Sequence, residues 1–212
     1  MDRPLERPPR RCLVLIRHGQ SQANADGLFT GLLDSPLTDL GRQEATAAGR
    51  RLGEAGLRFD AAFTSTLVRA IETSHLALDA LGQADLEARR DAALDERDYG
   101  VLSGLDKETA YRRFGAERVE NWRRSYKSLP PDGESLRDTV ARIVPFYLRD
   151  IQPAAMRGQI LVVGHGNALR ALVMVLEGLG PSEVEALEIP TGSIRIYRFE
   201  PDTSIASREL MG

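Results

Sequence analysis

Residues 13–19 read LVLIRHG, and residues 160–166 repeat the arrangement as ILVVGHG. Each stretch has four apolar residues, one further residue and then His-Gly. A short continuous apolar run is typical of a strand that is buried on both faces of a parallel sheet. The carboxyl ends of such strands border the ligand crevice, so we expect His18 and His165 to face each other across one pocket.

The segments between these two strands alternate between helix and strand patterns. Thr38 is a good N-cap for an Ala-rich helix that should stop at Gly56. Residues 59–64 predict a second strand. Residues 67–81 then carry apolar side chains at helical spacing, which predicts a helix with Arg69 near its N-terminus and off its buried stripe.

The second half of the chain continues this alternation. Residues 136–147 and 167–179 predict amphipathic helices, and residues 194–199 predict a last strand before a short tail. Residues 95–134 are rich in charge and turn formers, which indicates an insertion over the sheet edge that lines or covers a site. The expected fold class is α/β, with a mostly parallel central sheet and helices on both faces in three layers.

Composition limits the class of protein. With 212 residues and 42% hydrophobic content, we expect a flexible tail over residues 1–10 and a single domain over residues 11–212. We find no membrane-length apolar run and no secretory signal, which favours a cytoplasmic protein without a membrane partner. Cys12 is the one cysteine, and no His/Cys cluster has zinc-ligand spacing, so neither a disulfide nor a metal is indicated. A net charge of -3 argues against a nucleic-acid partner.

A single His-Gly pair is a weak motif, and an ordinary histidine at a strand end is the alternative interpretation. Two such pairs in matching positions, with Arg17 before one and Asn167 after the other, favour a shared site. His75 has no such context, and we interpret it as an ordinary helix residue.

Residues 15–21, LIRHGQS, resemble the RHG signature of the histidine phosphatase superfamily, and residues 164–167, GHGN, resemble its second histidine motif. Residues 96–107, ERDYGVLSGLDK, and residues 122–124, WRR, are similar to the mutase branch, the 2,3-bisphosphoglycerate-dependent phosphoglycerate mutases of the short form. The resemblance extends over about residues 12–205 and implies the phosphoglycerate mutase-like fold.

The resemblance also implies roles for individual residues. His18 would be the nucleophile that becomes phosphohistidine, Glu96 the acid and base, and His165 a charged donor. Arg17 and Arg69 would hold the phosphoryl oxygens beside His165. The implied substrate contacts are Asn24, Thr30, Gly31, Tyr99, Lys107, Arg123, Arg124, Gly166 and Asn167.

The implied reaction interconverts 3-phosphoglycerate and 2-phosphoglycerate, with 2,3-bisphosphoglycerate priming the histidine and no metal. Phosphoglycerates would be the partners, and a homo-oligomer, dimer or tetramer, is expected by resemblance. A phosphomonoesterase on the same fold is the alternative, which Lys107, Arg123 and Arg124 disfavour. An inactive domain that binds phosphorylated ligands is a third interpretation, which the full set of catalytic-type residues disfavours.

Three positions depart from the mutase pattern. Leu32 stands where a tryptophan is frequent, Asp132 where a glycine is common, and Ser193 near a missing proline. With Leu32 and Asp132 in these positions, the family pattern does not predict the shape of the entrance to the site. Because the C-terminal tail is short, the pattern also does not predict whether the tail closes the site.

Overall fold

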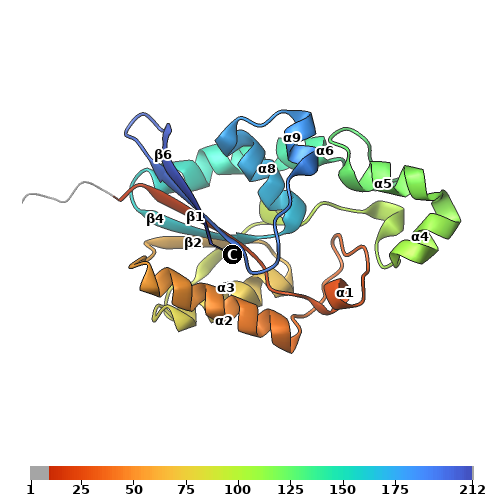
Figure 1. Cartoon of the computed structure of the whole chain (residues 1–212). Helices are drawn as coiled ribbons and strands as arrows, with labels where there is room; N and C mark the ends of the chain where they lie inside the picture. Colours follow the sequence, from red (N-terminus) through yellow and green to blue (C-terminus); the bar gives the residue numbers. More distant parts are fainter. Residues whose placement is uncertain (1–9, 212) are drawn as a thin grey trace, which may run out of the picture.

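A six-stranded sheet organises residues 10–211, the part of the chain that the computed structural model describes (Figure 1). The strands are β1 (Cys12–Arg17), β2 (Ala61–Thr64), β3 (Ala88–Arg90), β4 (Gln159–Gly164), β5 (Ile194–Phe199) and β6 (Ile205–Met211). Their order is β3-β2-β4-β1-β5-β6. The first four are parallel, whereas β5 runs antiparallel to β1 and β6 antiparallel to β5. The predicted mostly parallel sheet is confirmed, and the predicted N-terminal tail lies, except for Arg10, outside the described residues.

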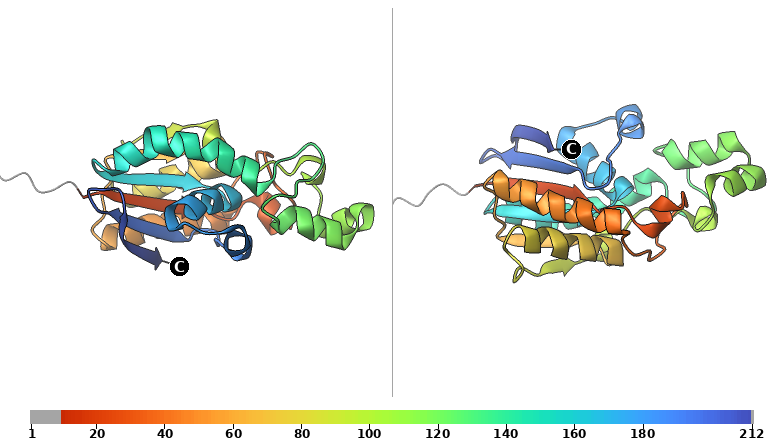
Figure 2. Two further views of the ribbon diagram at one scale, coloured as in Figure 1. Left: turned by 90° about the horizontal axis from the view of Figure 1, so that it is seen from above. Right: turned by 60° about the horizontal axis from the view of Figure 1, so that its bottom comes forward.

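Helices cover both faces of this sheet (Figure 2). They are α1 (Gln22–Ala25), α2 (Asp39–Glu54), α3 (Val68–Ala80), α4 (Lys107–Phe114), α5 (Ala116–Arg124), α6 (Leu136–Phe146), α7 (Gln152–Ala155), α8 (Gly166–Glu177) and α9 (Pro181–Ala186). Short 3₁₀ turns lie at Ala92–Leu94 and Gly100–Leu102, and a π-helical turn at Tyr147–Ile151 joins α6 to α7.

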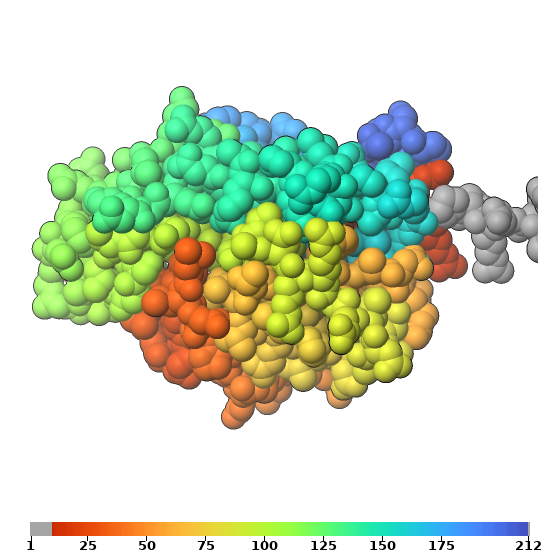
Figure 3. Space-filling model, turned by 180° about the vertical axis from the view of Figure 1, so that it is seen from behind, coloured from red at the N-terminus to blue at the C-terminus, as the bar shows by residue number. Residues whose placement is uncertain are grey.

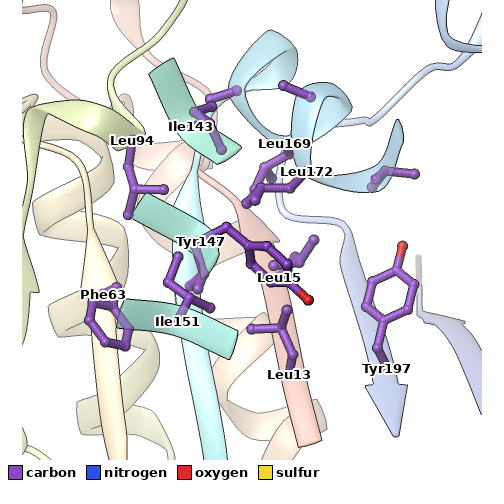
Figure 4. Close-up of a cluster of buried hydrophobic side chains, with 14 of the residues drawn as sticks. Leu13, Leu15, Phe63, Leu94, Ile143, Tyr147, Ile151, Leu169, Leu172 and Tyr197 are labelled. Carbon is purple, nitrogen blue, oxygen red and sulfur yellow. The ribbon is translucent and has the colours of Figure 1, made fainter. Parts of the chain in front are cut away.

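Successive side chains of β1 enter two different cores, as the period of a strand requires. Leu13 and Leu15 pack in the core that α6 and α8 cover, part of which Figure 4 shows. Val14 and Ile16 pack in the core under α2 and α3. Both faces of the strand are therefore dry, which explains its uninterrupted apolar sequence and confirms the three layers.

The predicted helix limits hold where a capping residue specifies them. Thr38 Oγ1 accepts a hydrogen bond from the Gly41 amide at 3.1 Å and begins α2. The helix ends before Gly56, whose φ of 69° is in the left-handed region that glycine adopts without strain.

The segment of residues 95–134, predicted to lie over a sheet edge, lies at the edge that the carboxyl ends of the strands form. It carries α4 and α5 and extends past the carboxyl ends of the strands, where it projects from one end of the molecule (Figures 1 and 3). A small separate core holds it, built from Phe29, Leu102, Ala110 and Val119. The segment therefore stands beside the edge of the sheet at which His18 and His165 emerge.

The predicted C-terminal tail is wrong for residues 205–211, because they form the edge strand β6. Residues 206–210 are exposed, so the strand shows no apolar alternation in sequence. Its pairing with β5 depends on backbone hydrogen bonds, which a hydrophobic pattern cannot reveal.

Candidate active site

The two histidines emerge at the same level of the sheet. Arg17 at the end of β1 pairs in register with Gly164 at the end of β4, so His18 and His165 follow side by side. Both side chains are buried, and their ring centroids lie 4.9 Å apart at an interplanar angle of 58°. The two motifs thus meet, as the sequence predicts.

His18 has one ring nitrogen assigned by its contact. Nδ1 lies 2.7 Å from the carbonyl oxygen of Gly19, which can only accept, so Nδ1 carries the proton and Nε2 has the free electron pair. Burial lowers the pKa of His18 well below its usual range, and the charges of Arg17 and Arg69 lower it further. The ring is therefore a neutral imidazole with an unprotonated Nε2.

His165 is held through its other nitrogen. Nε2 lies 2.7 Å from Ser65 Oγ, while Nδ1 is buried with no hydrogen-bond partner in the described residues. Burial lowers the pKa of His165 well below its usual range, and electrostatic interactions with His18, when that ring is protonated, and with Arg69 lower it further. A charged His165 would thus require an anion beside it to offset these effects.

Two arginines flank the histidine pair. Arg17 donates from Nη1 to the Ile189 carbonyl at 2.6 Å, and its Nε is buried with no hydrogen-bond partner within residues 10–211. Arg69 is 1% exposed and donates to the carbonyls of Leu33 at 2.7 Å and Gly31 at 2.9 Å, and its Nε also has no partner in the part of the chain that the structure describes. The prediction that Arg69 lies off the buried stripe of α3 is wrong, because loop carbonyls satisfy its guanidinium inside the protein.

The glycines after the two histidines pack against different parts of the protein. A Cβ on Gly19 would lie 2.1 Å from the Gly41 carbonyl oxygen, so the loop after β1 contacts the backbone of α2 there. A Cβ on Gly166 would lie 3.6 Å from both the Arg17 Cζ and the Glu96 Oε2 atoms. Gly166 borders the cavity between these side chains, whereas Gly19 is not among the residues that line it.

Glu96 is buried beside the histidine motifs. Its Oε1 accepts hydrogen bonds from the backbone amides of Arg97 at 2.8 Å and Asn167 at 3.0 Å. The carboxylate therefore stands at the N-terminus of α8, where the helix dipole favours negative charge. Asn167 in turn directs Nδ2 to the Tyr99 hydroxyl at 3.3 Å.

A cavity of about 280 Å³ opens above these groups. The predicted residues that line it are Arg17, Asn24, Thr30, Gly31, Glu96, Tyr99, Lys107, Arg123, Arg124, Gly166 and Asn167. His18, His165 and Arg69 are not among its lining residues and are buried. Arg123 and Arg124 reach it together because they end α5 and the chain turns extended at Ser125.

Three further residues at or behind this cavity escaped the sequence analysis. Arg170 and Glu188 line it, and the Glu188 carboxylate forms an ion pair with Arg124. Arg97 donates to the Trp122 carbonyl at 3.1 Å and the Arg123 carbonyl at 3.0 Å, and its guanidinium lies over the Tyr99 ring. The spacing of Arg170, three residues after Asn167 on one helix, was the one available signal.

The departures from the mutase pattern lie outside the lining of this cavity. Leu32 is 46% exposed, and Asp132 is exposed with φ of 59° in the left-handed region. Ser193 donates from Oγ to the Pro190 carbonyl at 2.6 Å.

Within residues 10–211, no group of three or more His, Cys, Asp or Glu side chains has the arrangement of a metal site. In the same range, no helix is both long enough and apolar enough to span a bilayer.

Proteins of known identity resemble this chain over nearly its whole length. Curated relatives named 2,3-bisphosphoglycerate-dependent phosphoglycerate mutase, from Brucella anthropi and Mesorhizobium japonicum, are each 53% identical over 202 residues, or 95% of this chain and 98% of the relative. One from Methylobacterium sp. (strain 4-46) is 54% identical over 95% of this chain and 97% of the relative.

Several solved structures of similar fold have phosphatase or hydrolase names. A mycobacterial glucosyl-3-phosphoglycerate phosphatase complexed with VO3 has a TM-score of 0.80 and 28% identity, and "Mycobacterial hydrolase 1" has a TM-score of 0.80 and 27% identity. Each match covers 95% of this chain and 97% of the other. The family model described as "Histidine phosphatase superfamily (branch 1)" matches residues 13–208. This chain therefore belongs to the histidine phosphatase superfamily, branch 1.

Proposed function

We propose that this enzyme interconverts 3-phosphoglycerate and 2-phosphoglycerate through a phosphohistidine at His18. The observation that carries the proposal is a pair of buried imidazoles, 4.9 Å apart, beneath a cavity lined by Lys107, Arg123 and Arg124. Relatives that are 53% identical and bear the name of this mutase support it.

His18 is the nucleophile. Neutral imidazole attacks phosphorus through an unprotonated nitrogen, and the Gly19 carbonyl keeps the proton on Nδ1, so Nε2 takes the phosphoryl group. The same carbonyl stabilises the positive charge that the ring acquires when Nε2 is phosphorylated.

Positive groups around His18 neutralise the negative charge on the oxygens of the phosphoryl group during its transfer. Among the residues that the structure describes, three buried nitrogens lack hydrogen-bond partners and fit an anion there: the Nε atoms of Arg17 and Arg69, and Nδ1 of His165. A phosphoryl group beside His165 opposes the effects that lower its pKa, so the ring binds a proton and donates it in a hydrogen bond.

Glu96 moves the proton of the substrate hydroxyl. Its carboxylate borders the cavity beside Gly166, whose missing Cβ leaves room between Glu96 and Arg17. As a phosphoglycerate hydroxyl attacks phosphohistidine, Glu96 accepts the proton, and it returns the proton when the hydroxyl leaves in the reverse transfer.

The rest of the substrate binds to the cations at the outer part of the cavity. Lys107 begins α4, and Arg123 and Arg124 end α5. These three cations bind the carboxylate of the substrate and the phosphate that is not being transferred, and the two helices hold them in place. When bound, 2,3-bisphosphoglycerate supplies the phosphoryl group that primes His18. The remaining neutral donors are Asn24, Thr30, Gly31, Tyr99 and Asn167.

We further propose that the enzyme acts in the cytoplasm as one domain over residues 11–212, and as a homo-oligomer, dimer or tetramer. Its location follows from soluble phosphoglycerates as substrates, and its oligomeric state from family resemblance. Size-exclusion chromatography with light scattering tests the oligomeric state.

A phosphomonoesterase is the second candidate, because solved neighbours with TM-scores of 0.80 include a phosphatase. The two activities share phosphohistidine and differ in whether water or a phosphoglycerate hydroxyl attacks it.

Phosphorus NMR separates the candidates. Purified protein is incubated with 3-phosphoglycerate, a trace of 2,3-bisphosphoglycerate and a chelator. Formation of 2-phosphoglycerate with little inorganic phosphate, lost in His18→Ala, supports the mutase. Phosphate without the isomer would assign a phosphatase, and no reaction with any phosphomonoester would leave a binding domain.

A further inference from the structure

Arg170 lies one turn after Asn167 on α8, lines the cavity and is nevertheless 7% exposed. A buried guanidinium is stable only when acceptors surround it. Its acceptors come from two separate segments of the chain, and both segments carry groups of the candidate active site.

The first segment is the end of α9. Arg170 donates from Nε to the Val184 carbonyl at 3.1 Å and from Nη2 to the same oxygen and to the Glu185 carbonyl at 3.2 Å. Carbonyls at a helix C-terminus lack partners within the helix and carry partial negative charge, so a cation caps them well.

The residues after α9 reach two cations of the site. Glu188 forms an ion pair with Arg124, and the Ile189 carbonyl accepts a hydrogen bond from Arg17 at 2.6 Å. By fixing the end of α9, Arg170 fixes the starting point of the segment that orients both side chains.

The second acceptor is the side chain of Asn167. Arg170 donates from Nη1 to Asn167 Oδ1 at 2.9 Å. Because a guanidinium has no acceptor, this contact requires the amide oxygen to face Arg170 and the amide nitrogen to face Tyr99 and the cavity. In the flipped orientation Asn167 would present an oxygen to an anionic ligand.

We propose that Arg170 is a positioning residue for the phosphoglycerate site: its fork holds the Asn167 amide as a donor and anchors the segment from Val184 to Ile189. This proposal rests on the proposed function. Arg170 acts through geometry, because four of its five N–H groups are used by protein acceptors.

The test is a double-mutant cycle of Arg170→Lys and Asn167→Ala, read as kcat/KM in the mutase assay. Lysine keeps the charge but cannot bridge Asn167 and Val184 at once, so we expect at least a tenfold loss. Asn167→Ala should lose a similar factor, and the double variant should lose clearly less than the product of the two. Arg58→Lys is the matched control, since Arg58 also donates to a carbonyl, that of Gly82 at 3.1 Å, and should keep wild-type activity.

Two results would overturn the proposal: kcat/KM of Arg170→Lys within twofold of wild type, or losses that multiply fully in the double variant. Melting curves check that the variants fold, and Arg170→Gln replaces the lysine variant in the cycle if that variant does not. An inactive wild type would refute only the proposed mutase function, because calorimetric affinities for 3-phosphoglycerate across the same cycle still report on Arg170.

Discussion

Lowering the pH should destabilise this protein through its two buried histidines. Burial and neighbouring positive charge lower the pKa of both His18 and His165 well below the usual value. The folded protein therefore binds fewer protons than the unfolded chain, whose histidines titrate near about 6.5. The stability that neutral rings allow is complete above that pH and is lost as the pH falls below it.

The size of the effect follows from linkage. If both rings stay neutral in the folded protein, each lowers the free energy of unfolding by about 1.4 kcal/mol between pH 7.5 and 5.5, and the pair by about 3 kcal/mol. For a chain of this length, that loss corresponds to a fall in Tm of roughly 6–12 °C.

Urea unfolding followed by circular dichroism at pH 7.5, 6.5 and 5.5 measures this loss directly. A variant with His18→Asn and His165→Asn should lose most of the pH dependence. His75→Asn is the control, because His75 is exposed on α3 whereas His18 and His165 are buried. Equal pH dependence in wild type and in the double variant would refute the assignment of two neutral buried rings.

Three further changes test separate parts of the site. Gly19→Ala should destabilise the fold by about 1–3 kcal/mol in urea unfolding, because its Cβ would lie 2.1 Å from a backbone oxygen of α2; the control Gly53→Ala should cost clearly less, because its Cβ would meet the end of the Leu81 side chain at 3.3 Å and no backbone atom. Glu96→Gln should lower kcat by about 10²–10⁴ in the mutase assay without lowering Tm, and unchanged turnover would contradict its assignment as acid and base. Glu188→Gln should raise KM for 3-phosphoglycerate by up to about fivefold, because it removes the exposed ion pair, worth at most about 1 kcal/mol, that orients Arg124; a lower KM would mean that Glu188 competes with the substrate for Arg124.

The features that the sequence predicts best are strands whose two faces are both buried. The apolar runs before His18 and His165 are read correctly because both faces of their strands are covered, and parallel pairing then brings the histidines together. Thr38 likewise predicts the start of α2, because a cap is a local interaction.

Prediction fails where the partner of a residue is distant in the chain. The sequence around Arg69 does not show that the carbonyls of Gly31 and Leu33 accept its N–H groups inside the protein. It also does not show that Arg170 donates to the end of α9. Local periodicity contains no information about acceptors from a remote loop. The edge strand β6 escapes for a related reason, since its pairing is made by backbone atoms and its side chains are exposed.

The small core of Phe29, Leu102, Ala110 and Val119 lets substrate recognition evolve separately from the phosphoryl chemistry. It supports α4 and α5, which carry Lys107 and Arg123, while the histidine pair is supported by the two cores of the sheet. Substitutions in the small core can reshape substrate recognition while the groups for phosphoryl chemistry keep their support. The fold is thus divided into a conservative part and an adaptable part, so new substrates can be acquired without rebuilding the reaction.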